Sequence, residues 1–244
     1  LVVLAALSAN LDYEVANEVL EKLKRRDYGD DAPPNEQAYN LVISSCSSPV
    51  RARELVREMR LTRRHRVGVI PPSLRTYSRA IAVCRRAADL TMALTLFDGV
   101  KDDGFEPDVY VYSAVIWTAA EVGDGVVASA ILTVMKDSGV APNVVSYNGL
   151  LSAYTASGRF EDAVTAFAEL QDQVTATRTS FKILSRAAKT LADPSERCLF
   201  LDEIYSRMKV CDKHVAVGGQ LIEVLIFAKA ARGLFEEAHA AFEA

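Results

Sequence analysis

Apolar residues recur with helical spacing between residues 144 and 170. The first group falls at positions i, i+3, i+4 and i+7, so its members share one face of a helix: Tyr147, Leu150, Leu151 and Tyr154. Gly158 interrupts this helix, and a second apolar stripe follows: Phe160, Ala163, Phe167 and Leu170. The pattern predicts two amphipathic helices joined by a short turn, and no strand pattern competes with it.

This two-helix pattern repeats with a period of 35 residues. The aromatic residue of the first helix recurs as Tyr77, Tyr112 and Tyr147, and Phe181 follows 34 residues later. Two columns of the second helix keep the same step: Ala93, Ala128 and Ala163 in one, and Phe97, Leu132 and Phe167 in the other. A fixed period of this length predicts a solenoid, in which each unit buries its apolar face against its neighbours.

The period divides the single array 1–244 into repeat units. Complete repeats are expected at 73–108, 109–143 and 144–177, degenerate repeats at 35–72 and 178–217, and partial repeats at 1–34 and 218–244. In the unit 178–217 we expect the connection to lengthen around 191–197 and the second helix to resume near Leu201. Because both end units are incomplete, we expect the sequence to be a piece of a longer array.

Composition and charge narrow the possible functions. With 50% hydrophobic and 25% charged residues, the chain is typical of a folded protein. Its net charge of -4 and pI near 5.5 argue against coating nucleic acid through bulk charge, but they leave room for a local basic groove. The longest apolar runs, 1–7 and 126–135, are shorter than the roughly 20 residues that cross a bilayer, so no membrane partner is expected.

Cysteines and histidines form no catalytic or metal-binding motif. The four cysteines lack C-x-x-C spacing, which argues against a disulfide scaffold and favours a reducing compartment. Cys46 and Cys84 fall in an apolar helix column and are predicted to be packing residues. His65, His214 and His239 are far apart and lack ligand spacing. We therefore expect no catalytic residue, no metal, no cofactor and no enzymatic activity.

The stretch VVSYNGLLSAYTASGRFEDAVTAF, at 144–167, resembles the pentatricopeptide repeat family. The matching pattern is V-x-x-Y-N-x-L-[IL]-x-x-Y-x-x-x-G-x-x-x-x-A-x-x-x-F, closed by Pro and then Asp or Asn, and the resemblance is specific over 73–177. It implies an all-α, right-handed superhelical solenoid of helix-turn-helix repeats, with the first helices on the concave side. It also implies binding of single-stranded RNA, roughly one base per repeat, in mitochondrial or chloroplast RNA processing, stabilisation or translation. We expect any targeting peptide to have been removed or to lie outside this segment.

The resemblance further implies roles for particular residues. A base is read by the residue after the first-helix aromatic and by the last residue of the unit: Ser78 with Asp108, Ser113 with Asn143, Asn148 with Thr177, and Asn40 with Ser73. The residue three positions before the first reader sandwiches the base: Arg75, Tyr110 and Val145. Short hydroxyl and amide side chains suit contact with the Watson-Crick edge of an unpaired base. By resemblance, the pairs of Ser78 and Ser113 prefer purines and Asn148 a pyrimidine.

Charged residues on the first helix of the unit 178–217 suggest a backbone contact. Lys182, Arg186 and Lys189 fall at i, i+4 and i+7, and this basic stripe would either follow a phosphate backbone or form a solvated helix face. Lys182 and Glu223 stand where base readers should be small and polar, so we expect their units not to read bases in the family's way. Trp117 shares the face of Ser113 and would either stack on a base or pack between units.

Two alternatives to an independent RNA binder stay open. The chain would otherwise be a structural subunit of an organellar ribosome or another large assembly, contacting protein and RNA, or the RNA-binding arm of a larger enzyme. The expected partners are single-stranded RNA and, under the first alternative, ribosomal or other organellar complex proteins. The arginine-rich segment 51–66 fits a solubilising surface or such a protein or ribosomal RNA contact.

Overall fold

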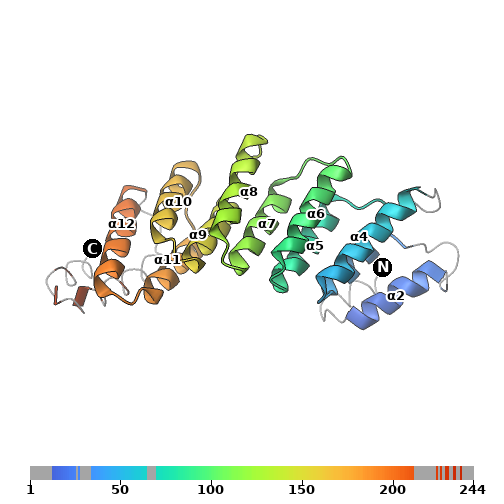
Figure 1. Ribbon diagram of the computed structural model, residues 1–244, viewed down its shortest axis with the longest axis horizontal. Coiled ribbons are helices and arrows are strands. Elements are labelled where there is room, and N and C mark those ends of the chain that lie inside the picture. The colour runs from blue at the N-terminus through green and yellow to red at the C-terminus, as the bar shows by residue number, and fades with distance from the viewer. Residues whose placement is uncertain are drawn as a thin grey trace. The chain divides into compact units, whose positions relative to one another are not determined.

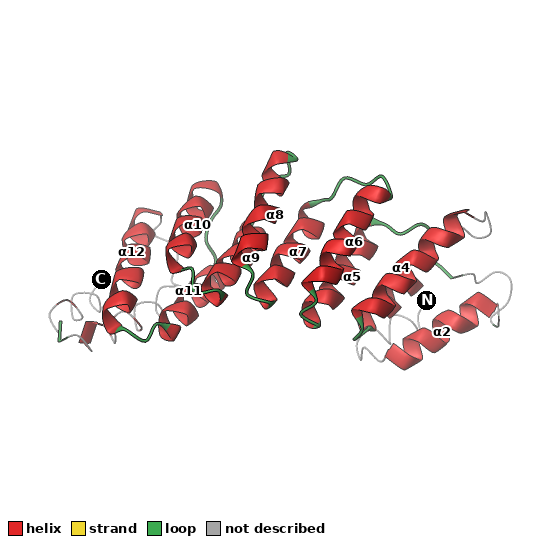
Figure 2. Cartoon of the chain, viewed as in Figure 1, coloured by secondary structure: helices red, strands yellow, loops and turns green. Residues whose placement is uncertain are grey.

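The computed structural model describes residues 13–25, 27, 34–64, 70–211, 224, 226, 229, 230, 233, 234 and 237. In these ranges every regular element is an α-helix and no strand occurs (Figure 2). The first helices of the repeats are α3 (Glu36–Ser45), α5 (Leu74–Arg86), α7 (Val109–Glu121), α9 (Val144–Ala156) and α11 (Arg178–Thr190). The second helices are α2 (Tyr13–Arg25), α4 (Pro49–Arg64), α6 (Leu90–Asp102), α8 (Gly125–Asp137), α10 (Phe160–Gln173) and α12 (Pro194–Cys211) (Figure 1).

The chain forms two compact units, residues 1–118 and 119–244, whose boundary falls within α7. In the first unit, α3 packs beside α5, and α4 contacts α6. In the second unit, α9 packs beside α11, and α10 packs beside α12. Within each unit, first helices therefore pack on first helices and second helices on second helices, as a stack of helical hairpins requires.

The first helices begin at residues whose side chains cap them. Asn35 Oδ1 accepts a hydrogen bond from Ala38 N at 2.9 Å, and Asn143 Oδ1 accepts one from Ser146 N at 3.1 Å. Each cap satisfies a backbone donor that the first helical turn leaves unpaired. The turn to the second helix depends on a positive φ, which is 73° at Gly158 and 53° at Ala88, one of the rare non-glycine residues there.

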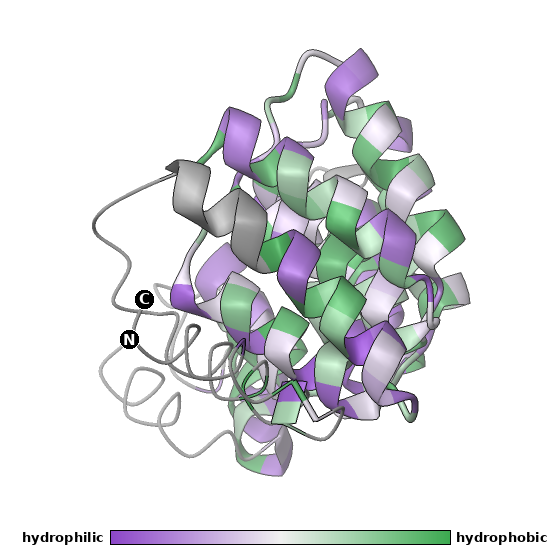
Figure 3. Cartoon of the chain, turned by 90° about the vertical axis from the view of Figure 1, so that its left-hand side faces the viewer, coloured by the Kyte–Doolittle hydropathy of each residue, from purple (hydrophilic) through white to green (hydrophobic). Residues whose placement is uncertain are grey.

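The helices bury the apolar columns that the period defines. Figure 3 shows apolar and polar residues interspersed along the helices. The side chains of Tyr77, Tyr112 and Tyr147 are at most 1% exposed. In the second helices, Ala93, Ala128 and Ala163 are fully buried, and their small size lets neighbouring helices approach.

A contact of three charged or polar side chains joins consecutive hairpins. In each instance a buried first-helix tyrosine donates a hydrogen bond to a carboxylate that follows on or after the second helix of the same hairpin. The same carboxylate binds a cation from the second helix of the preceding hairpin. The three instances are Tyr39, Glu58 and Lys24; Tyr77, Asp103 and Arg60; and Tyr147, Glu169 and Lys136.

The second instance is the least exposed to solvent. Tyr77 OH lies 2.6 Å from Asp103 Oδ2, and Arg60 Nε lies 2.6 Å from Asp103 Oδ1, where the carboxylate is 12% exposed. Burial, and then the hydrogen bond to Asp103, raise the pKa of Tyr77 above its usual range, so the hydroxyl keeps the proton that it donates. We name these three groups the tyrosine–carboxylate–cation contacts.

The second helix of the unit 178–217 begins earlier than the sequence suggested. Helix α12 starts at Pro194 rather than near Leu201. Asp193 Oδ1 accepts a hydrogen bond from Ser195 N at 2.9 Å, and the proline occupies the first helical position, where its missing N–H costs nothing. The connection from α11 is therefore short, and the predicted lengthening around 191–197 is wrong.

Several predictions fall on positions outside the described residues. Glu223, His65, His214 and His239 are among them, as are most of the partial repeats 1–34 and 218–244. The repeat boundaries themselves stay predictions.

Candidate nucleic-acid interface

The predicted base-sandwiching residues occupy the second position of their helices and face solvent. Arg75 on α5 is exposed, and the side chains of Tyr110 on α7 and Val145 on α9 are 72% and 47% exposed. Each lies two residues before a buried tyrosine of the core column, so the helix turns it outward. A tyrosine this exposed leaves an aromatic face free for stacking.

The predicted base readers that follow the buried tyrosines are more enclosed than expected. Asn40, Ser113 and Asn148 are 6%, 7% and 4% exposed, and Ser78 is half-buried. Buried polar side chains normally find hydrogen-bond partners within the protein.

Three of these readers nevertheless keep an unsatisfied polar atom. Asn40 Oδ1, Ser78 Oγ and Asn148 Oδ1 are buried without a hydrogen-bond partner. In the described part of the chain, Arg197 Nε is the only other such side-chain atom. The unsatisfied atoms thus concentrate in one repeat position, next to the exposed sandwiching residues.

Two of the predicted pairs are brought together. Asn148 Nδ2 donates to Thr177 Oγ1 at 3.5 Å. Asn40 and Ser73 meet through Glu36, whose Oε1 accepts from Asn40 Nδ2 at 3.0 Å and from Ser73 Oγ at 2.5 Å. Sequence reasoning missed Glu36, although its position four residues before Asn40 on one helix face was a usable signal.

The other two predicted pairs are Ser78 with Asp108 and Ser113 with Asn143. Ser78 and Asp108 share no hydrogen bond among the described residues, and Ser113 and Asn143 belong to different units. Asp108 Oδ1 and Asn143 Oδ1 cap the following first helices, which explains why the last residue of a repeat is short and polar. The capping bonds use one oxygen of each side chain, so Asn143 Nδ2 remains available.

Charge differs between the two sets of helices. The first helices α3, α5, α7, α9 and α11 together hold eight basic and two acidic residues, whereas the second helices α2, α4, α6, α8, α10 and α12 hold 14 basic and 15 acidic residues. Among the second helices, α6, α8 and α10 are acidic, with two basic and seven acidic residues, and α4 is basic. The first helices therefore carry a net positive charge, although the net charge of the whole chain is negative. A polyanion would be attracted to the basic helices α5 and α11 and repelled by the acidic helices α6, α8 and α10.

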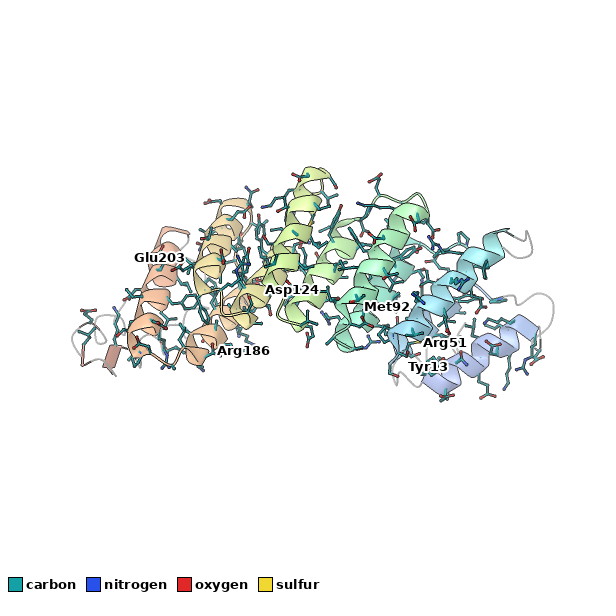
Figure 4. All side chains as sticks on the ribbon, in the orientation of Figure 1. Tyr13, Arg51, Met92, Asp124, Arg186 and Glu203 are labelled. Atoms are coloured by element: carbon teal, nitrogen blue, oxygen red, sulfur yellow. The ribbon has the colours of Figure 1, made fainter. Side chains whose placement is uncertain are left out.

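The basic stripe on α11 is exposed. Lys182, Arg186 and Lys189 all face solvent, and none forms an ion pair with another described residue. Figure 4 labels Arg186 on this helix. On α5, by contrast, Arg79 donates to Ser44 Oγ at 2.5 Å, and Arg86 donates to the carbonyl oxygen of Ser44 at 2.8 Å. The cations of α11 are free for phosphate, while these two of α5 hold the end of α3.

Trp117 lies against a cation instead of standing alone. It is half-buried, and the Arg85 guanidinium carbon lies 6.0 Å from the centre of its ring. Part of the indole stays accessible, so the structure allows both stacking on a base and packing between helices.

Two arginines of the segment 51–66 have structural roles that the sequence did not indicate. Arg51 Nε donates to Tyr13 OH on α2 at 3.1 Å (Figure 4), and Arg60 binds Asp103 after α6. They join second helices rather than forming a solubilising surface, whereas Arg53 and Arg57 are exposed.

The thiols of the first unit are inert packing groups, as predicted. Burial raises the pKa of Cys46 to about 11 and that of Cys84 to about 12, so both stay protonated. Within the described ranges, no group of three potential metal ligands comes together, and no helix is long and apolar enough to cross a membrane.

Sequence profiles and solved structures identify the architecture. A profile described as "Pentatricopeptide repeat domain" matches residues 95–157, and one described as "PPR repeat" matches 145–173. The two profiles together assign pentatricopeptide repeats to residues 95–173. No curated protein sequence matches it.

Solved pentatricopeptide repeat proteins have the same fold. PPR10 in complex with an 18-nucleotide psaJ RNA element is 22% identical with a TM-score of 0.64, over 99% of this chain and 32% of that chain. PPR10 from maize gives the same coverage with a TM-score of 0.62. The PPR domain of Arabidopsis thaliana protein-only RNase P 1, in complex with tRNA, is 18% identical with a TM-score of 0.57, over 76% of this chain and 95% of that domain.

These similarities confirm the predicted α-solenoid of helix-turn-helix repeats. The chain spans about a third of the length of the PPR10 chains that it matches. The roles of individual pentatricopeptide residues stay predictions.

Proposed function

We propose that this pentatricopeptide array binds single-stranded RNA along its first helices. The observation that carries the proposal is the set of unsatisfied buried atoms on Asn40, Ser78 and Asn148, which recur at one repeat position beside exposed sandwiching residues. Buried donors and acceptors without a hydrogen-bond partner are costly unless a ligand completes them. An unpaired base presents a hydrogen-bonding edge and two faces for stacking, so it fits both columns.

The low exposure of the readers sets a condition on binding. Because Asn148 is 4% exposed, its amide must rotate away from Thr177 before it can reach a base edge. The 3.5 Å bond to Thr177 is long, so its loss costs little. A base that enters this position would accept the hydrogen bond that Asn148 Nδ2 now donates to Thr177 and would also donate one to Asn148 Oδ1.

The basic α11 stripe supplies the second part of the proposal. Lys182, Arg186 and Lys189 follow one face of a helix whose reader position is itself a lysine. This repeat would contact phosphate without selecting a base, while its neighbour α9 would select one.

The array acts by occupancy, in mitochondria or chloroplasts, by protecting a transcript segment or delivering it to another factor.

The test is a titration against a randomised single-stranded RNA pool at two salt concentrations. The variant Ser78→Ala/Ser113→Ala/Asn148→Ala is compared with Thr95→Ala/Thr133→Ala/Thr165→Ala, which removes three exposed hydroxyls from second helices. We expect the first variant to lose the selected sequence and the second to keep it. Binding that depends on salt alone and is equal in both variants would contradict base reading.

A scaffold role in a large assembly is the second candidate. It is favoured by exposed apolar side chains on second helices, where Val126 and Leu199 are 65% and 69% exposed. An array that shows no affinity for the RNA pool but co-purifies with a defined organellar complex would support this role.

A further inference from the structure

An apolar groove opens between two second helices of the unit 119–244. It has a volume of about 740 Å³ and lies between the N-terminal parts of α10 and α12. Phe160, Val164, Leu199 and Phe200 form its apolar lining. The rings of Phe160 and Phe200 meet edge to face at 5.5 Å, and the Leu199 side chain is 69% exposed. A leucine so exposed beside two aromatic rings is a surface that a partner would cover.

Carboxylates rim this groove. Glu161 and Glu196 are exposed, and neither pairs with a cation in the described ranges; Glu203 on α12 also lines the groove (Figure 4). Asp162 is paired with Arg159 at 2.7 Å. Acidic residues in the first turn of a helix interact favourably with the helix dipole, and this accounts for Glu161, Asp162 and Glu196 at the starts of α10 and α12. It does not account for the exposed apolar lining. The rim repels RNA phosphate and attracts cations.

The same chain carries a surface of complementary character on α4. Val50, Arg53, Arg57 and Leu61 fall at i, i+3, i+7 and i+11, so they form one stripe along the helix. Val50 and Leu61 are 49% and 44% exposed, and the two arginines between them are exposed without a carboxylate partner among the described residues. The stripe is apolar at both ends and basic in the middle.

We propose that two copies of this chain associate head to tail, with the α4 stripe of one copy seated in the α10–α12 groove of the next. A helix that lays apolar side chains into a groove is a common mode of protein recognition. Val50 and Leu61 would contact the lining around Leu199, and Arg53 and Arg57 would lie opposite Glu161 and Glu196. Charge and apolar character are complementary on both surfaces, and neither belongs to the first helices that the RNA proposal uses.

Because the two surfaces differ, the contact is heterologous: each copy offers one stripe and one groove. Association therefore continues beyond a pair unless the rotation between copies closes a ring. The expected behaviour is a mass that rises with concentration above the 26.6 kDa monomer and falls with added salt.

Charge reversal and restoration test the contact by sedimentation velocity. The stripe variant is Arg53→Glu/Arg57→Glu, the groove variant is Glu161→Lys/Glu196→Lys, and a third protein carries all four changes. We expect each two-site variant to weaken self-association by about tenfold or more and the four-site variant to restore it, because the ion pairs are re-formed with opposite sign.

A matched control carries the same change in net charge as the groove variant, at two positions outside the groove. Asp137→Lys/Asp172→Lys alters two exposed carboxylates on α8 and α10 that do not line the groove, and it should associate like the parent chain. Circular dichroism establishes that every variant is folded. A parent chain that stays monomeric up to high concentration, or a four-site variant that fails to regain association, would overturn the proposal. RNA affinity of the monomeric variants is a separate readout.

Discussion

First and second helices differ in what their charged groups do. On α11 the cations Lys182, Arg186 and Lys189 are exposed and unpaired within the described ranges, whereas Arg60 on α4 and Lys136 on α8 each bind a carboxylate of the next hairpin. Similar residue types thus serve two purposes. The comparison teaches that Arg60 and Lys136 join consecutive repeats, whereas the cations of α11 are available to a ligand.

Because the α11 stripe is available to a ligand, its substitution should have the largest effect on RNA affinity. Lys182→Glu/Arg186→Glu/Lys189→Glu should lower affinity for single-stranded RNA by about 10- to 100-fold. The slope of log K against log salt should decrease in magnitude by roughly 2, at about 0.7 per phosphate contact. Fluorescence anisotropy titrations at several salt concentrations measure both.

The control for this prediction reverses three exposed cations of second helices. Arg25→Glu/Arg53→Glu/Arg57→Glu has the same change in net charge, and we expect it to alter RNA affinity less than threefold. If the two variants lost affinity equally, only the net charge of the chain would matter, and the distinction between first and second helices would fail.

The largest stability effect should come from a tyrosine–carboxylate–cation contact. Tyr77→Phe removes the hydroxyl that donates to Asp103, a carboxylate only 12% exposed, and should lower the free energy of unfolding by about 1 to 2 kcal/mol. Urea denaturation followed by circular dichroism measures it. Tyr110→Phe, at a 72% exposed position, is the control and should stay within about 0.5 kcal/mol of the parent. Equal stability of both variants would contradict the claim that this contact stabilises the packing of consecutive hairpins.

Much of the fold follows from the sequence because its columns are set by packing. Tyr77, Tyr112 and Tyr147 recur at one step, and a buried face at helical spacing leaves the chain few alternatives. The early start of α12 was missed because the stretch 191–197 breaks the period. The local signal was nevertheless present, as Asp193 followed by Pro194 is a helix-start pair.

The candidate site was harder to predict than the fold. Column position predicted which residues share a face, and Tyr110 and Val145 are indeed exposed. It did not predict that Asn148 and Asn40 would be almost buried, because that depends on neighbouring repeats and on Glu36. Nor could it indicate that Arg51 and Arg60 bind other helices, since those contacts span 38 and 43 residues.

A smaller effect on binding is expected from Asn148. Asn148→Ala should cost about 1 kcal/mol of discrimination at one base position, with overall affinity changed little. It also removes the unsatisfied Oδ1, so stability should not fall. Selection from a randomised RNA pool shows whether the base preference at that RNA position is lost. Ser152→Ala, one turn further along α9, is the control and should keep the parent's preference.

The smallest effect concerns the turn that connects the two helices of a hairpin. Ala88 adopts φ 53°, while Gly123 and Gly158, at the same place in the next two repeats, adopt 71° and 73°. An alanine in this region is strained by roughly 1 to 2 kcal/mol, and the greater freedom of unfolded glycine offsets part of any relief. Ala88→Gly should therefore raise the free energy of unfolding by about 0.5 to 1 kcal/mol, and Gly158→Ala should lower it by a similar amount. Neither change touches the charges of the first or the second helices, so RNA affinity should stay the same. A change in affinity from Ala88→Gly would mean that the hairpin angle, rather than the surface of the first helices, controls binding.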